Sequence, residues 1–186
     1  MRVELALDPA ASGELLEIPA PEFRDLRADP SALDRIADAR RYPRLRSVLA
    51  AINSADSVFS SVRSTADLSP GNPSASTPCG FSSSLAIVFA EEELNSDHDL
   101  AHQTATHLAE VLGGDTQDSS SRISISLSPC LFRTSGRRGV ALAFSVFTEG
   151  ATPEQAEMRW GLALTRLQQA LLFVSRVIRR NRRGAD

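Results

Sequence analysis

The chain contains no lysine, so all 20 of its basic residues are arginine. This absence excludes enzymes that form a Schiff base through lysine, pyridoxal phosphate enzymes among them, and it excludes the lysine of a P-loop. The use of arginine alone, together with abundant alanine, is typical of a genome rich in G and C. We therefore expect a bacterial origin.

Long apolar runs are also missing. No run approaches the roughly 18 residues that a membrane-spanning helix needs, so we expect no membrane association. Near the N-terminus, Glu4, Asp8 and Glu14 interrupt the apolar stretch that a secretory signal peptide requires. These patterns predict a cytoplasmic protein. The two cysteines, Cys79 and Cys130, fit this prediction as free thiols, although the sequence leaves open whether they pair.

The formal net charge of −3 is too small to create a field that recruits nucleic acid. The charge is unevenly placed, however, because a basic patch lies near the C-terminus: Arg176, Arg179, Arg180, Arg182 and Arg183. Such a patch either complements the negative end of a helix dipole or binds nucleic acid or an acidic partner. No aromatic residues are interleaved with these arginines, which weakens the nucleic-acid interpretation.

Alternating apolar and polar residues predict four strands, at 57–68, 81–92, 122–133 and 140–149. Helical patterns follow the second and the fourth of these strands, at 97–112 and 153–181. The order strand-strand-helix thus occurs twice. It predicts an α+β fold in which two ββα repeats form one antiparallel sheet with helices packed on one face. The sequence leaves open whether the two repeats arose by duplication.

The first third of the chain predicts an N-terminal helical arm. Residues 2–7 have the alternation of a short strand, and prolines break any long element over 8–30. Two short helices are expected at 31–41 and 43–53, the second beginning with a proline. We therefore divide the chain into an arm, 1–55, that packs on a main domain, 56–186.

One face of the predicted sheet carries mostly serine and alanine. In the strand over 122–133, the isoleucines point to one face while Ser124, Ser126 and Ser128 point to the other. A solvated face explains this pattern. The alternative is that the small side chains admit the sheet of a second subunit, which makes this face a candidate interaction surface.

The long helix over 153–181 has two apolar stripes. One, with Trp160 and several leucines, is expected to lie on the sheet. The other is thinner and contains Met158, Leu162 and Phe173, which indicates a covered surface. Either the helices expected at 31–53 cover this second stripe, or another subunit does. We prefer the first interpretation, since those helices must bury their own apolar residues.

All three histidines lie close together, and His98-Asp-Leu-Ala-His102 differs by one methylene from the H-E-x-x-H pattern of zinc hydrolases. His98 and His102 are four residues apart and share a helix face, with Glu92 as a nearby acid. No third ligand has a suitable spacing, however. We interpret the segment as a helix start, with Ser96 as the cap and Asp99 in the first turn, and expect neither a metal nor a cofactor.

These observations favour a non-enzymatic binding or assembly protein with no catalytic residues. Its partner is expected to be another protein or a second copy in a homodimer, bound through the Ser/Ala sheet face and the long helix. Two alternatives stay open. One is a metal-dependent hydrolase that uses Glu91–Glu93 with His98 and His102, and the other is nucleic-acid binding through the C-terminal arginines.

Overall fold

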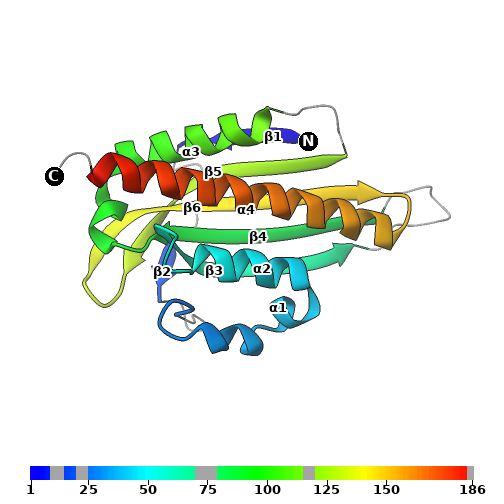
Figure 1. Ribbon diagram of the computed structural model, residues 1–186, viewed down its shortest axis with the longest axis horizontal. Coiled ribbons are helices and arrows are strands. Elements are labelled where there is room, and N and C mark those ends of the chain that lie inside the picture. Colours follow the sequence, from blue (N-terminus) through cyan, green and yellow to red (C-terminus); the bar gives the residue numbers. More distant parts are fainter. Residues whose placement is uncertain (9–14, 20–24, 70–78, 115–119, 184–186) are drawn as a thin grey trace.

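The structure is a computed structural model that describes residues 1–8, 15–19, 25–69, 79–114 and 120–183 (Figure 1). Of the prolines expected to break any long element over 8–30, Pro9 and Pro21 lie outside this part of the chain, as does most of the loop that separates the first two predicted strands. None of the described helices has both the length and the apolar character that crossing a membrane demands.

The four predicted strands and the two long helices are confirmed. The strands are β3 (Phe59–Ser69), β4 (Cys79–Phe89), β5 (Ser121–Phe132) and β6 (Arg137–Gly150). The helices are α3 (His98–Gly113) and α4 (Pro153–Arg183). Alternation and helical spacing are properties of neighbouring residues, which is why the sequence locates these elements well.

The N-terminal segment differs in detail from the expectation. It forms two strands, β1 (Arg2–Ala6) and β2 (Leu16–Ile18), of which only the first was predicted. The helix expected over 31–41 is divided into a 3-10 helix, η2 (Pro30–Arg35), and one turn of α-helix, α1 (Ala37–Arg41), because Ile36 between them is extended. The next helix, α2 (Pro43–Ile52), begins at its proline as expected.

The six strands form one mixed sheet, in the order β1-β5-β6-β4-β3, with β2 also paired to β5. The neighbours β3–β4, β4–β6 and β5–β6 are antiparallel, as expected. The prediction of a purely antiparallel sheet is wrong, because β1 and β2 both lie parallel to β5. These two short strands cover successive parts of the outer edge of β5, whose N–H and C=O groups would otherwise lack partners.

The order β3–β4–α3 is followed along the chain by β5–β6–α4, and the second strand of each set lies in the centre of the sheet. The interpretation of these sets as two repeats of one unit stays a prediction, and so does the division of the chain at residue 55. A single hydrophobic core includes residues from both sides of that boundary, such as Leu45, Leu49, Trp160 and Leu164.

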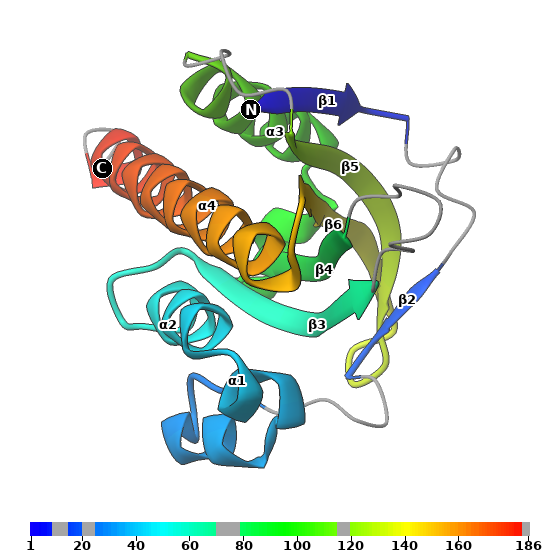
Figure 2. The same ribbon diagram turned by 90° about the vertical axis from the view of Figure 1, so that its right-hand side faces the viewer.

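The helices α2, α3 and α4 lie on the concave side of the curved sheet, with α4 in the middle (Figure 2). The buried stripe predicted for the long helix is confirmed, and Trp160 lies near its start. The centroid of the Trp160 ring is 4.4 Å from that of Phe81 and 5.4 Å from that of Tyr42. Its indole N–H donates to the hydroxyl of Ser83 at 2.8 Å, so this ring is both packed and hydrogen-bonded.

Side chains of the N-terminal segment cap the outer edge of β3. Arg27 donates to the carbonyl of Phe59 at 3.0 Å, Asn53 accepts from the N–H of Ser61 at 3.1 Å, and Asp38 accepts from the N–H of Ala66 at 3.0 Å. These bonds satisfy backbone groups that no further strand pairs. The segment thus protects the edge of the strand that follows it in the sequence.

Asn95 fixes the connection between β4 and α3, which contains the 3-10 helix η4 (Glu92–Ser96). Its fully buried amide accepts from the N–H of Phe89 at 2.7 Å and donates to the carbonyls of Phe89, Glu91 and Glu92. Gly139 on β6 lies so close that a Cβ there would meet the carbonyl oxygen of Asn95 at 2.6 Å. The Asn95 amide therefore positions the acidic residues of this connection.

We expect Asn95→Ala to lower the free energy of unfolding by about 2 to 4 kcal/mol, because it removes the acceptor of the buried Phe89 N–H and a donor to the Phe89 carbonyl. Urea denaturation followed by circular dichroism measures this loss. Gln103→Ala, at an exposed position of α3, is the matched control and should change the value by less than about 0.5 kcal/mol. Equal losses in the two variants would contradict this role of Asn95.

Candidate functional site

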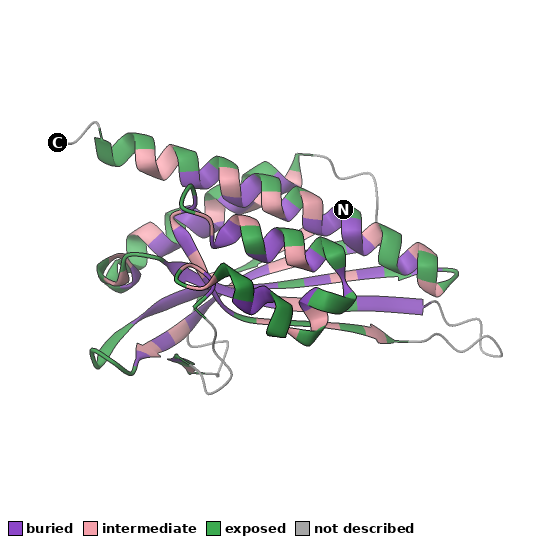
Figure 3. Ribbon diagram, turned by 60° about the horizontal axis from the view of Figure 1, so that its bottom comes forward, coloured by how far each residue is buried: buried purple, intermediate pink, exposed green. Residues whose placement is uncertain are grey.

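One face of α4 is exposed over the whole length of the helix. Its residues recur at spacings of three and four and form what we call the outer face of α4: Glu154, Met158, Leu162, Arg166, Gln169, Phe173, Arg176 and Arg180. Figure 3 shows exposed and buried residues alternating along this helix, which ends near the C-terminus. The opposite face lies on the sheet and belongs to the core.

The three apolar residues predicted as a second stripe are exposed. Relative exposures are 61% for Met158, 59% for Leu162 and 45% for Phe173. The expectation that the N-terminal helices cover this stripe is wrong. Helix α2 packs beside α4 on the same side of the sheet and buries its own Leu45, Val48, Leu49 and Ile52 in the core. Helix α2 thus buries its apolar residues without covering the outer face of α4.

A pocket of about 380 Å³ opens beside the start of the outer face, and we call it the α2–α4 pocket. Tyr42, Pro43 and Arg44 line it from the α2 side, and Met158, Gly161 and Leu162 line it from α4. Gly161 lies close beneath Arg44, since a Cβ at this glycine would meet Cγ of Arg44 at 3.3 Å. Two of the three exposed apolar side chains therefore border a concave surface.

The charges on the outer face are opposite at its two ends. Glu154 is at the start of α4 with Glu157 beside it, and Arg176 and Arg180 are near the end. Within the described chain, Glu154, Glu157 and Arg180 form no ion pair, and the Arg176 side chain donates to the carbonyl of Leu172 on its own helix. Hydrogen bonds at the helix start, from its own backbone N–H and from Thr152, lower the pKa of Glu154. This end of the face is therefore negatively charged at neutral pH.

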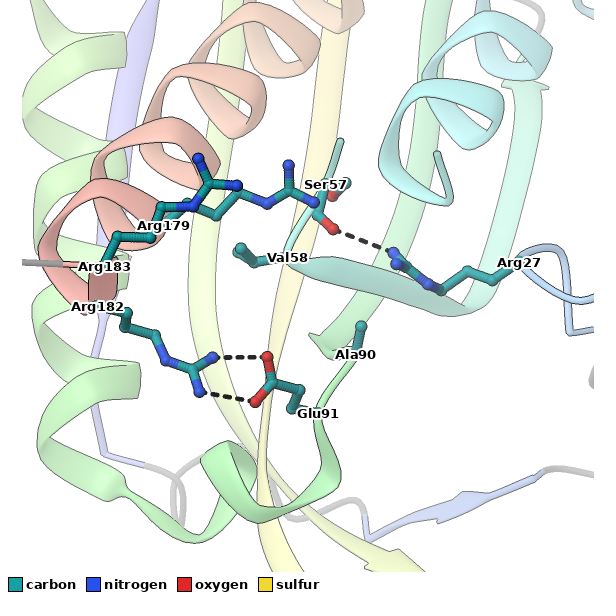
Figure 4. Close-up of a pocket in the computed structure, with 8 residues that line it drawn as sticks. All are labelled: Arg27, Ser57, Val58, Ala90, Glu91, Arg179, Arg182 and Arg183. Atoms are coloured by element: carbon teal, nitrogen blue, oxygen red, sulfur yellow. Dashed lines mark hydrogen bonds and ion pairs between the residues drawn. The ribbon is translucent and has the colours of Figure 1, made fainter. Parts of the chain in front are cut away.

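The other arginines of the predicted basic patch turn toward a pocket of about 480 Å³ (Figure 4). Arg182 forms a bidentate pair with Glu91, at 2.6 and 2.8 Å, and these hydrogen bonds hold the pKa of Glu91 below its usual value. Arg179 binds the carbonyl of Ala55 and lies 3.6 Å from a carboxylate oxygen of Asp56. Arg183 lines the same pocket. Arg179 and Arg183 also border a smaller pocket of about 290 Å³ together with Arg176 and Arg180, so the basic patch extends from the larger pocket to the outer face of α4.

Arg27 reaches this pocket from the N-terminal segment and was not identified from the sequence. One of its guanidinium nitrogens donates to the carbonyls of Ser54, Ser57 and Phe59, at 3.0 to 3.1 Å. Three protein acceptors therefore engage this group, which fixes the turn between α2 and β3. Arg179 and Arg182 line the same pocket but lie more than a hundred positions away in the sequence. No sequence signal connects Arg27 with them, because only the fold brings them together.

The histidine segment is the start of α3, as the sequence predicts, although the cap differs. Asp97, not Ser96, is the cap, and its side chain accepts from the N–H of Leu100 at 2.9 Å. His98 and His102 are exposed on the first turns. Within the described residues, no three His, Cys, Asp or Glu side chains are grouped so that they could hold a metal ion.

The glutamates proposed as partners of these histidines face other residues. Glu91 pairs with Arg182, as described above. Glu92 accepts from the hydroxyl of Ser135 and lies 3.9 Å from Arg137, and Glu93 pairs with Arg137 at 3.2 Å. The three acids therefore contact the β5–β6 turn, the start of β6 and the end of α4.

The Ser/Ala face is on the side of the sheet opposite the helices. The register of the strands places five polar residues in one row across the sheet: Glu4, Ser124, Ser145, Ser84 and Thr65. Several of these groups bond to one another, since Ser124 donates to Glu4 at 3.2 Å and the hydroxyls of Thr65 and Ser84 are 2.6 Å apart. Ser124 and Ser126 are partly exposed, whereas Ser128 is buried.

The far end of this face is apolar. A second, smaller core cluster consists of Ile18, Val62, Ala86, Val88, Cys130, Phe132 and Ala141, with Leu16 packed against it. Strand β2 supplies Leu16 and Ile18 to this cluster. The missed strand β2 therefore covers part of the face that the sequence predicts to be open.

Both cysteines are free and buried. Cys79 is the first residue of β4. Burial raises the pKa of Cys130 to about 11, which keeps this thiol protonated at neutral pH. A protonated, buried thiol is a poor nucleophile.

No model of a known protein family, no curated protein and no solved structure matches the chain. Its function is therefore inferred from its own residues, in particular from the outer face of α4 and the arginine-lined pocket.

We expect Arg27→Met to lower the free energy of unfolding by about 1 to 3 kcal/mol, because methionine keeps an apolar stem but cannot donate to the carbonyls of Ser57 and Phe59, whereas the carbonyl of Ser54 keeps the N–H of Ser57. Thermal and urea denaturation measure this change. Arg138→Met is the matched control, since Arg138 is exposed and its side chain has no partner in the described chain. A loss as small as that of the control would contradict the role assigned to Arg27.

We expect Cys130 to react at least about 100-fold more slowly with iodoacetamide in the folded protein than in concentrated urea at pH 8. The reason is that raising the pKa from 9.0 to about 11 lowers the thiolate fraction by that factor. The measurement uses a Cys79→Ser variant, in which Cys130 is the remaining thiol. Equal rates in the two states would show that the folded chain does not shield it.

Proposed function

We propose that this chain is a non-enzymatic assembly protein that binds another protein chain through the outer face of α4. The observation that carries this proposal is the exposure of Met158, Leu162 and Phe173 along one face of a helix whose other face is core. Exposed apolar residues that are aligned on one face mark interaction surfaces more often than scattered ones do. The α2–α4 pocket adds a concave element to this surface.

The surroundings of the three apolar residues also support protein binding. Polar and charged residues of the same face border them, among them Arg166, Gln169 and Arg176. An apolar centre with a polar rim is the usual composition of a protein–protein interface, and arginine and methionine are enriched there. The Ser/Ala sheet face is the weaker candidate surface, because several of its hydroxyls are engaged within the chain and β2 covers its apolar end.

The two alternative functions have less support. Nucleic-acid binding requires free arginines, but Arg179 and Arg182 are engaged by Asp56 and Glu91. A metal-dependent hydrolase requires Glu91–Glu93 near His98 and His102, but these glutamates pair with arginines and a serine. The cytoplasmic location and the bacterial origin stay predictions from the sequence.

The proposal is tested by placing a photoreactive residue, p-benzoylphenylalanine, at Leu162 or at Phe173 in cells that naturally produce the chain. We expect irradiation to give one discrete covalent adduct with a second polypeptide at each position, because a bound partner covers both. Mass spectrometry of the adduct identifies the polypeptide.

Val111 is the matched control position. It is an apolar residue with 42% relative exposure on α3, away from the outer face of α4. The same photoreactive residue there should give no such adduct. The proposal fails if the positions on α4 give no adduct, or if Val111 gives the same one.

A further inference from the structure

The outer face of α4 has a pattern that is complementary to itself. An acidic end with Glu154 and Glu157 is followed by apolar Met158 and Leu162, a polar middle with Arg166 and Gln169, apolar Phe173, and a basic end with Arg176 and Arg180. Read from the other end, the polar middle again lies between apolar positions, and the sign of the charge is reversed. An antiparallel copy of the helix therefore matches it.

The spacing of the residues makes this match quantitative. When Leu162 of one copy lies opposite Phe173 of the other, Arg166 lies opposite Gln169 in the middle of the contact. At a rise of about 1.5 Å per residue, Arg180 is then about 1.5 Å along the axis from the level of the second copy's Glu154. Arg176 is about 3 Å from the level of the second copy's Glu157. Glutamate and arginine side chains span such offsets easily.

The charges at the two ends are available for a partner. Glu154, Glu157 and Arg180 form no ion pair within the described chain, whereas Arg179 and Arg182, on the inner side of the same helix end, each have an acidic partner. The chain thus pairs Arg179 and Arg182 with its own acids, whereas Glu154, Glu157 and Arg180 at the two ends of the outer face have no ion pair within the described chain. Opposed helix dipoles favour the antiparallel arrangement as well.

We propose that the occupant of the outer face of α4 is a second copy of this chain, bound about a twofold axis with the two α4 helices antiparallel. Each copy places its Phe173 against Leu162 of the other, at the border of the α2–α4 pocket, and its Arg176 and Arg180 beside the acidic start of the other helix. Both contacts occur twice, as twofold symmetry requires. This inference rests on the proposed function, because it names the partner of the same surface.

Sedimentation equilibrium of the purified full chain tests the inference. We expect an average mass that rises with concentration toward twice the 20.0 kDa of one chain. Leu162→Glu and Phe173→Glu should each hold the mass at that of one chain, because they place a carboxylate in the apolar part of the contact. Val111→Glu is the matched control and should associate like the unmodified chain. Far-UV circular dichroism and thermal unfolding verify that each variant folds.

A charge exchange tests the antiparallel arrangement. The variant Glu154→Arg with Glu157→Arg and the variant Arg176→Glu with Arg180→Glu each bring like charges together at both ends of a homodimer. Each should therefore associate at least about tenfold more weakly than the unmodified chain. An equimolar mixture of the two variants restores opposite charges at both ends, so we expect a 1:1 heterodimer of nearly unmodified affinity. Added salt should weaken the unmodified dimer.

Three outcomes would overturn the inference: a single-chain mass at every concentration at which the protein stays dissolved, association that survives both Leu162→Glu and Phe173→Glu, and no heterodimer in the mixture. The adduct formed through p-benzoylphenylalanine separates this failure from that of the proposed function. An adduct with a different protein would contradict self-association but leave the binding role of α4 intact. The absence of any adduct at Leu162 and Phe173 would contradict both the self-association and the proposed function.

Discussion

The packing of α4 on the concave side of the sheet is the contact on which the rest of the molecule depends. Trp160 joins α4 to β4 through Phe81 and Ser83, and to the start of α2 through Tyr42. Helices α2 and α3 both contact α4 in addition to the sheet. The burial of one face of this helix thus assembles the core, and its length of 31 residues carries the opposite face across the whole molecule.

The end of α4 illustrates how one cluster of charges serves two purposes. Arginines at a helix C-terminus complement the helix dipole wherever they point. Those that point inward bind Glu91, Asp56 and a backbone carbonyl, and so hold the helix end against the α2–β3 and β4–α3 connections. Those that point outward, Arg176 and Arg180, make no such tie to another element in the part of the chain that the structure describes. The position of each arginine around the helix therefore decides whether its side chain ties the end of α4 to other elements.

The sequence predicts those parts of the fold that depend on neighbouring residues. The strands β3 to β6 and the helices α3 and α4 follow from alternation and helical spacing. Parallel pairing of β1 and β2 with β5 depends on residues more than a hundred positions apart, and β2 has only three residues, too few for a periodic signal. The exposure of Leu162 likewise depends on where α2 packs, which no local pattern encodes. The apolar stripe was therefore predictable, but what covers it was not.

The side chains that cap the edge of β3 have a consequence for how the chain can be divided. Arg27, Asp38 and Asn53 all precede residue 55, and they occupy backbone groups along the outer edge of a strand of 11 residues. A fragment that begins at residue 56 would present those groups, and the outer edge of β5, to any extended chain in solution. Unprotected strand edges of this kind recruit further strands and lead to aggregation. The first 55 residues thus prevent other chains from adding strands to the sheet, and they also contribute to the core.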